Sequence, residues 1–208
     1  MTTASPLSRS VLAGCLLALS LMSGCATVDQ NIALTYTHVD RSFGSHSGNI
    51  VVTRAESLAQ KRNDRGEWLL GSLNTAQGVH QANILTNRIP GEWITEALLL
   101  ELKKSGFNAA YRSALPDRVP VGVAITDIKA FLNVNKGAVS DDTRHEIQFN
   151  AHVFIDGSRV KIFTVASRDN RTFGLSVSRE DMERIMLQSL QEAMQQIVPD
   201  IISLIEKK

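Results

Sequence analysis

The sequence predicts an α+β domain in which an antiparallel sheet of about four to five strands carries two helices on one face. Three patterns support this fold class: amphipathic stretches at 90–105 and 178–207, and alternating apolar and polar residues over 146–167. Helical spacing of apolar residues indicates a helix, whereas strict alternation indicates a half-buried strand. We therefore expect the face of the sheet opposite the helices to be polar and hydrated.

The first 24 residues differ from the rest of the chain and predict a secretory signal. Arg9 is their only charged residue, an apolar run extends from Val11 to Met22, and small residues precede Cys25. A charged start, a short apolar run and small residues at the exit are typical of such signals. The run is shorter than the roughly 20 residues that cross a membrane. A buried first helix is the alternative, but the run has no amphipathic stripe.

Small residues directly before a cysteine resemble the lipobox of bacterial lipoproteins. Cys15 has almost no apolar segment before it, whereas Cys25 stands at the end of the apolar run, so we predict Cys25 as the lipidation site. The resemblance implies a thioether-linked diacylglycerol and an N-acyl chain on Cys25, and more than one chain gives stable anchoring. Ala26 follows instead of an aspartate, which by the same resemblance implies the outer membrane, facing the periplasm.

We expect three parts in the chain: a signal peptide over 1–24, an acylated N-terminus and flexible tether over 25–47, and a single α+β periplasmic domain over 48–208. Residues 26–47 are rich in Thr, Ser, His, Asp and Gly, which is typical of a tether. The two cysteines are assigned to the signal and to the lipid. The domain then has no thiol, so its stability must come from its core.

A long polar connection is expected over 56–88, after a first, β-branched strand at 49–55. A short strand near 84–86 is the only regular element predicted within it. Connections of this length are usually functional or mobile. The apolar triplet Trp68, Leu69 and Leu70 stands between charged stretches, so it is our candidate partner-binding tip. The alternative is that this triplet packs on the core of its own domain.

Local signals fix the ends of both helices. Pro90 suits the first turn of the first helix, and Gly106 with Phe107 suits a Schellman ending. Ser178 and Asp181 predict a capping box at the start of the second helix. Pro199 removes a backbone donor from that helix and predicts a kink.

The strands predict a bulge and a tight turn. Apolar alternation over 119–134 changes phase at Ile128, which predicts a bulge or bend near Thr126 and Asp127. Asp156-Gly157 is typical of a two-residue type I′ turn that pairs Ile155 with Ser158. An uninterrupted register from that turn places Val153 opposite Val160 and Ala151 opposite Ile162.

Composition and motifs argue against several functions. The mature part is electrically balanced, because the signal holds one base and no acid, so we expect no nucleic-acid partner. There is no G-x-S-x-G, P-loop, H-E-x-x-H or C-x-x-C motif, and we expect no catalytic, cofactor or metal site. His152 on the polar face of the hairpin and Asp141-Asp142 in a turn are expected to be solvated; a metal or proton site at His152 and a cation at the aspartates are the alternatives.

The run from Ile84 to Pro90, the helix from Trp93 to Phe107, the strand at 121–125, the hairpin and the closing helix together resemble the YajG-type bacterial envelope lipoproteins. The resemblance covers roughly residues 48–205. It implies an α+β lipoprotein domain and provides no catalytic residues to carry over.

Three functions are compatible with these features. The first is a non-enzymatic accessory lipoprotein that binds a protein partner in the cell envelope. The second is an auxiliary lipoprotein of a lipid or solute transport system, with an apolar ligand groove. The third is a hydrolase of envelope polymers, which would need converging carboxylates at a spacing that the sequence does not show.

Overall fold

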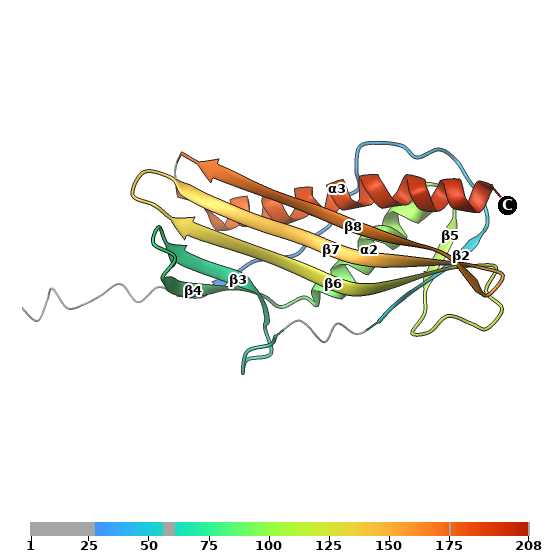
Figure 1. The fold of residues 1–208 in the computed structure, drawn as a ribbon, viewed down its shortest axis with the longest axis horizontal. Coiled ribbons are helices and arrows are strands. Elements are labelled where there is room, and N and C mark those ends of the chain that lie inside the picture. The colour runs from blue at the N-terminus through green and yellow to red at the C-terminus, as the bar shows by residue number, and fades with distance from the viewer. Residues whose placement is uncertain (1–27, 56–60, 175, 208) are drawn as a thin grey trace, which may run out of the picture.

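A computed structural model of the chain describes residues 28–55, 61–174 and 176–207 (Figure 1). The predicted signal and Cys25 lie outside the described residues. The elements in chain order are β1 (Gln30–Asn31), β2 (Asn49–Arg54), β3 (Trp68–Thr75), β4 (His80–Thr86), α2 (Pro90–Lys104), β5 (Asn108–Tyr111), β6 (Val121–Lys136), β7 (Asp141–Ile155), β8 (Ser158–Phe173) and α3 (Arg179–Glu206).

The strands of the described ranges form one mixed, 8-stranded sheet, so the predicted α+β class is confirmed, while the predicted strand number and purely antiparallel pairing are wrong. The long strand β6 organises this sheet. One edge of β6 pairs with β7 in antiparallel fashion, and its other edge is shared by β2 near its start and β3 near its end. Both of these strands run parallel to β6, a pairing that local sequence patterns do not predict.

The hairpin of β3 and β4 lies within the stretch predicted to be an irregular connection. Gly71 allows β3 to approach β6 closely, because a Cβ atom at this position would lie 1.9 Å from the carbonyl oxygen of Leu132. Leu70, Leu73 and Ile84 from this hairpin are buried in the core. The polar residues between them obscured the strand pattern in the sequence.

The meander of β6, β7 and β8 confirms the predicted bulge and turn. The register of β6 shifts between Thr126 and Lys129, and Asp127 takes a positive φ of 51°. Ile155 pairs with Ser158 across the Asp156-Gly157 turn, as predicted.

The register predicted beyond the turn is wrong. A second shift follows at once, so that Val153 pairs with Lys161 instead of Val160, and Ala151 pairs with Phe163 instead of Ile162. This extra residue in β8 reverses the phase of the strand and leaves Val160 and Ile162 exposed.

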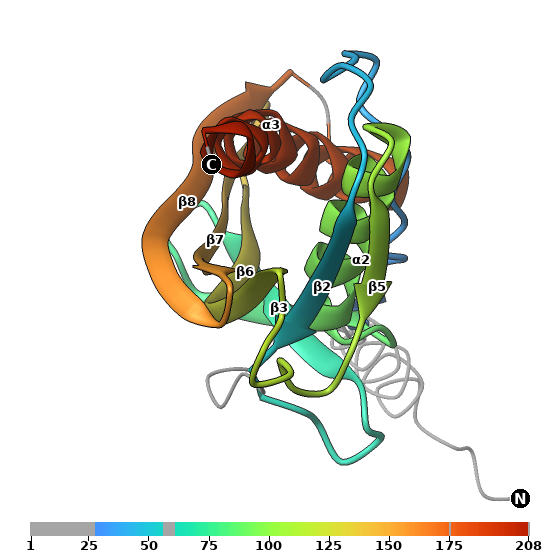
Figure 2. The ribbon, with the colours of Figure 1, turned by 90° about the vertical axis from the view of Figure 1, so that its right-hand side faces the viewer.

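Both helices cover the same side of the sheet and share one core with it. Seen along the long axis, β6, β7 and β8 curve so that α3 lies on their concave side, and α2 lies beside β2 and β5 (Figure 2). The Schellman ending of α2 is confirmed, since the amide of Phe107 donates to the carbonyl of Leu102 and Gly106 has φ 96°. The capping box of Ser178 and Asp181 is also present, and α3 continues through Pro199.

In the segment predicted to be a flexible tether, residues 28–31 lie beside β4 and parts of 32–47 pack against the helices. Ile32, Leu34 and Val39 are buried in this segment. Trp93 Nε1 donates to the carbonyl of Thr35 at 2.9 Å, and Arg88 Nη1 donates to that of Leu34 at 2.8 Å. The few apolar residues of this segment pack in the core, which its overall polar composition does not reveal.

Glu101 of α2 holds this segment in place through hydrogen bonds. Its side chain is fully buried, and Oε1 accepts hydrogen bonds from the Tyr36 hydroxyl at 2.7 Å and from the Val39 amide at 2.9 Å. Burial and the hydrogen bond to Glu101 raise the pKa of the Tyr36 phenol well above its usual range, so that it stays a donor. A buried carboxylate is tolerated only where donors satisfy it. Oε1 finds those donors in the segment at 36–39, whereas Oε2 is buried without a hydrogen-bond partner among the described residues.

Candidate functional site

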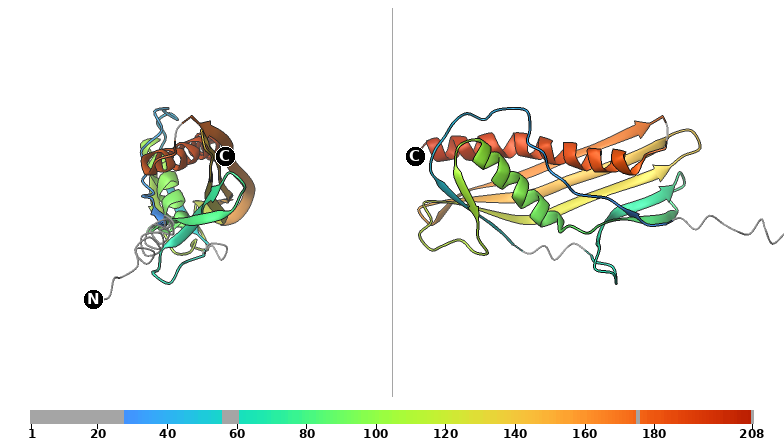
Figure 3. Two further views of the ribbon diagram at one scale, coloured as in Figure 1. Left: turned by 90° about the vertical axis from the view of Figure 1, so that its left-hand side faces the viewer. Right: turned by 180° about the vertical axis from the view of Figure 1, so that it is seen from behind.

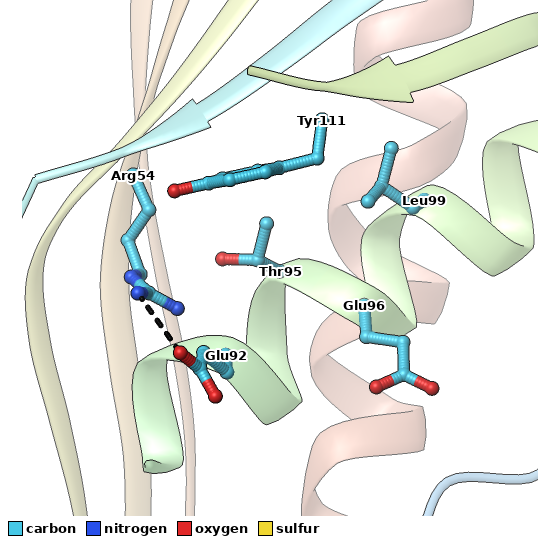
Figure 4. Close-up of a pocket in the computed structure, with 6 residues that line it drawn as sticks. All are labelled: Arg54, Glu92, Thr95, Glu96, Leu99 and Tyr111. Atoms are coloured by element: carbon cyan, nitrogen blue, oxygen red, sulfur yellow. Dashed lines mark hydrogen bonds and ion pairs between the residues drawn. The ribbon is translucent and has the colours of Figure 1, made fainter. Parts of the chain in front are cut away.

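A polar pocket lies between β2, β5 and α2 (Figure 4). Its volume is about 260 Å³. Arg54 from β2 enters it past Gly91, where a Cβ would come within 2.9 Å of the arginine side chain, and pairs with Glu92 at 3.5 Å. The remaining lining residues are Thr95, Glu96, Leu99 and Tyr111.

The chemistry available in this pocket is that of polar recognition. Glu96 is ion-paired with Arg88, and the Thr95 hydroxyl donates to the carbonyl of Gly91 at 2.7 Å. The lining therefore provides a guanidinium, two carboxylates and a half-exposed phenol, but no nucleophile with an adjacent base. Such a pocket suits a polar side chain or head group more than a reacting substrate.

The outer edge of β8 is the second candidate site. Among the described strands β8 pairs only with β7, although it is 16 residues long. An edge strand presents unpaired amide and carbonyl groups that can pair with another chain. The first five residues of β8 are exposed, and they include the apolar side chains Val160 (47% exposed) and Ile162 (43%).

Charge along this edge is predominantly positive. Arg159, Lys161, Arg168 and Arg171 are basic, and Asp169 is the one acidic residue of the strand. Asp169 accepts a hydrogen bond from Arg171 Nε at 2.9 Å, which together with the Asn170 amide lowers the pKa of that carboxyl. The arginines at 159 and 168 and the lysine at 161 make no ion pair within the described residues.

A polar network occupies the outer face of the sheet at the β6 bulge. Asp127 accepts hydrogen bonds from Thr126 and Asn150, which lower the pKa of its carboxyl. His152 lies on the same face, with Nε2 3.1 Å from the Thr126 hydroxyl. This confirms a polar outer face, and the open sheet surface around the network shields no substrate from water.

His145 is a buried titratable residue on the opposite, inner face of β7. Neither ring nitrogen has a hydrogen-bond partner, and the residue is almost completely buried. Burial lowers the pKa of the imidazole, and the Arg171 charge lowers it further. Burial thus favours the neutral imidazole, and the residue also lines a hollow together with Arg168 and Asp169.

The predicted site residues occupy different places. Leu70 is buried in the core, which agrees with the alternative that the triplet packs on its own domain. Trp68 and Leu69 are half-buried at the start of β3, with the Arg62 guanidinium 4.8 Å from the Trp68 ring centre. Cys25 lies outside the described residues, so its lipidation stays a prediction. The triplet lies far from the β8 edge, because β6 and β7 separate the two strands.

One expectation for a polar residue is corrected. Asp141 does not lie in a solvated turn but at the start of β7, where it is buried and accepts a hydrogen bond from the Val177 amide at 2.8 Å. Over the described ranges, no three His, Cys, Asp or Glu side chains gather closely enough to hold a metal ion. Over the same residues, no helix is both long and apolar enough to span a membrane.

Sequence reasoning missed both candidate sites. The pocket takes its residues from three elements that are distant in sequence, so no local spacing marks it. The β8 edge did leave a signal, because two basic residues, Arg159 and Lys161, fall on the second strand of the predicted hairpin. These basic residues indicate a binding surface only once the strand order shows that β8 lies at an edge of the sheet.

The described residues thus form an α+β domain with a pocket between β2, β5 and α2 and an open, basic sheet edge. No family model matches it, and no curated protein matches its sequence. A solved protein from Xanthomonas campestris, assigned to the DUF330 family, is similar with a TM-score of 0.51 and 11% identity, covering 88% of this chain and 100% of that one. That similarity shows a shared fold.

Two further solved structures have lower scores. A putative neuraminyllactose-binding hemagglutinin homolog from Helicobacter pylori has a TM-score of 0.45 and 9% identity over 85% of this chain and 99% of its own. The rare lipoprotein B of Shewanella oneidensis has a TM-score of 0.35 and 10% identity over 64% and 97%. Neither names a YajG-type protein, so that resemblance stays a prediction.

Proposed function

We propose that this protein is a lipid-anchored, non-enzymatic accessory protein of the bacterial cell envelope, which binds a protein partner in the periplasm. Cys25 provides the anchor, and the Ala26 that follows it favours the outer membrane. The observation that carries the proposal is the open edge of β8, since a long strand with a free edge is a ready template for a partner strand.

The chemistry of this edge favours an extended, acidic partner segment. Strand addition gains affinity from main-chain hydrogen bonds and specificity from alternate side chains. Arg159 and Lys161 would face acidic residues of the added strand, and Val160 and Ile162 would lose their exposed apolar surface to it. Complementary charge also speeds the encounter of the two proteins.

The transport alternative, with an apolar ligand groove, has less support. The pocket between β2, β5 and α2 is lined by Arg54 and two glutamates beside Leu99 and Tyr111, so it suits a ligand that carries a polar group. Burying a lipid chain against these charged groups would cost desolvation energy, because a hydrocarbon cannot replace the hydrogen bonds to water that the charged groups lose.

A photo-crosslinking amino acid in place of Ile162 tests the proposal in cells. The expected result is a crosslink to one envelope protein from position 162. The same probe in place of Arg144, which is exposed on β7 away from the edge, should yield none.

Like charges brought together across an interface cost several kcal/mol. The double substitution Arg159→Glu and Lys161→Glu should therefore reduce the crosslink at least about tenfold.

Two outcomes would contradict the proposal. One is an equal pattern of crosslinks from positions 162 and 144. The other is a crosslink from 162 that survives the double charge reversal but is lost in a matched variant with Lys103→Glu and Lys136→Glu, two lysines outside β8. Membrane release of a Cys25→Ser variant separately tests the anchor.

A further inference from the structure

Exposed large apolar side chains gather at two opposite ends of the described structure. Val28 (72% exposed), Val79 (63%) and Val139 (84%) belong to one end, which we call the valine end. Val79 lies in the β3–β4 turn and Val139 in the β6–β7 turn. These two turns are neighbours because Thr75, the last residue of β3, pairs with Lys136, the last residue of β6. Figures 1 and 3 show both turns at the end where the described chain begins.

The turns of the valine end contain no charged residue. Residues 76–79 are Ala-Gln-Gly-Val and residues 137–140 are Gly-Ala-Val-Ser. The opposite end differs, because the connection at 112–120 contains Arg112, Asp117 and Arg118, and the β7–β8 turn contains Asp156. Two adjacent turns that lack charge and display exposed valines form an apolar patch, and such patches mark interaction sites.

The position of the chain start brings the predicted anchor to the same end. Gln30 pairs with Ile84, and the Asn83 amide donates to Asp29 Oδ1 at 2.7 Å, so β1 runs alongside β4. Continuing that register places Val28 about three residues from the level of Val79, which is about 10 Å along the strand. Cys25 stands three residues before Val28, and three residues span at most about 11 Å. The acylated residue can therefore reach the plane of the valine turns.

We propose that the valine end docks on a phospholipid bilayer, with Val79 and Val139 in the head-group region beside the acyl anchor. This inference rests on the proposed acylation of Cys25. Because residues 28–31 lie beside β4 and parts of 32–47 pack against the helices, only three residues separate Val28 from the lipid, and the domain is held at the membrane rather than at the end of a long tether. The β7–β8 turn, with Val160 and Ile162 just beyond it, then points away from the bilayer.

Depth measurements on the acylated, full-length protein test this orientation. Cys15 is removed with the signal and Cys25 is blocked by lipid, so one introduced cysteine is the only free thiol. The variants Val79→Cys, Val139→Cys and Val160→Cys each receive an environment-sensitive fluorophore and are reconstituted into vesicles of phosphatidylethanolamine and phosphatidylglycerol that contain a lipid-borne quencher. Val160 is the matched control, since it is also an exposed valine close to a hairpin turn.

The expected result is blue-shifted, quenched emission from positions 79 and 139 and unquenched emission from position 160. Adding Val79→Asp to the protein labelled at 139 should reduce the quenching. Vesicle-bound protein with all three labels equally unquenched would overturn this inference and leave the proposed function standing. Protein that carries no acyl chain and does not bind the vesicles would overturn both.

Discussion

At the scale of single residues, the most consequential side chain is Glu101, which joins the N-terminal segment to α2. We expect Glu101→Ala to lower the free energy of unfolding by about 3 kcal/mol, because the Tyr36 hydroxyl and the Val39 amide lose their buried acceptor. Tyr36→Phe removes one donor and should cost about 1 kcal/mol. Urea denaturation of the protein measures both values. Asp200→Ala, at an exposed position of α3, is the control and should change stability by less than about 0.5 kcal/mol.

The Glu101→Ala substitution should also have an effect confined to the N-terminal segment. Loss of the acceptor at Glu101 should loosen residues 36–47, so trypsin should cut more quickly after Arg41 in the Glu101→Ala protein than in the unchanged protein. If the rate of cleavage after Arg41 is equal in the two proteins, Glu101 does not hold the segment in place.

His145 makes stability depend on pH. Its pKa is lowered in the folded protein from the ordinary value of 6.5, first by burial and then by Arg171. The unfolded chain therefore binds the proton more readily, so stability is fully present above pH 6.5 and decreases as the pH falls below that value. Thermal unfolding between pH 7.5 and 5.5 measures the effect. His145→Leu should flatten this dependence, and an unchanged pH slope in that variant would refute the assignment.

At the scale of elements, the closest approach in the sheet is between β3 and β6. Gly71→Ala should lower the free energy of unfolding by about 2–3 kcal/mol, because its methyl group would meet the Leu132 carbonyl and force the strands apart. Gly174→Ala is the matched control, since nothing lies within 4 Å of a Cβ at that position. Equal unfolding midpoints for the two variants would show that the strands separate at little cost.

The elements also show which structure can be predicted from sequence and why. Both helices were found with their ends, because capping residues and apolar spacing act within a few positions. The Asp156-Gly157 turn was found for the same reason. The register beyond the turn was wrong, because one bulged residue in β8 depends on how the sheet curves around α3. The parallel pairs of β2 and β3 with β6 join distant segments, and nothing in a local pattern indicates them.

The candidate sites also divide into features that the sequence predicts and features that it does not. Cys25 and the apolar triplet were proposed because each is continuous in sequence, and Leu70 proved to be core. The pocket of Arg54 depends on the packing of α2 beneath β2, and the β8 edge depends on the final strand order. Tertiary topology, rather than residue type, decides which polar side chains become a surface for binding.

At the scale of the whole molecule, the described structure is polarised from end to end. The valine end lies where the described chain begins, whereas the β7–β8 turn lies at the far end of the long sheet (Figure 1), and Val160 and Ile162 follow that turn in sequence. The strands of the meander run the length of the molecule and connect the two ends rigidly. If the proposed anchor and partner strand are both present, this rigid connection would hold the partner strand at a fixed distance from the membrane.

The N-terminal segment is the part of the whole molecule whose role is most directly measurable. A protein that begins at Gly48 lacks Ile32, Leu34 and Val39, each of which is buried. Burying such a side chain contributes about 1.5–3 kcal/mol, so their joint loss approaches the 5–15 kcal/mol that stabilises a typical domain. We expect the protein beginning at Gly48 to unfold cooperatively only at a much lower temperature, or not to fold, whereas a protein beginning at Val28 folds. Circular dichroism on heating distinguishes them, with Asp40→Ala and Arg41→Ala in the longer protein as a control that alters only exposed residues. Equal midpoints for the two lengths would show that residues 28–47 act as a tether and would remove the reason for a domain held close to the membrane.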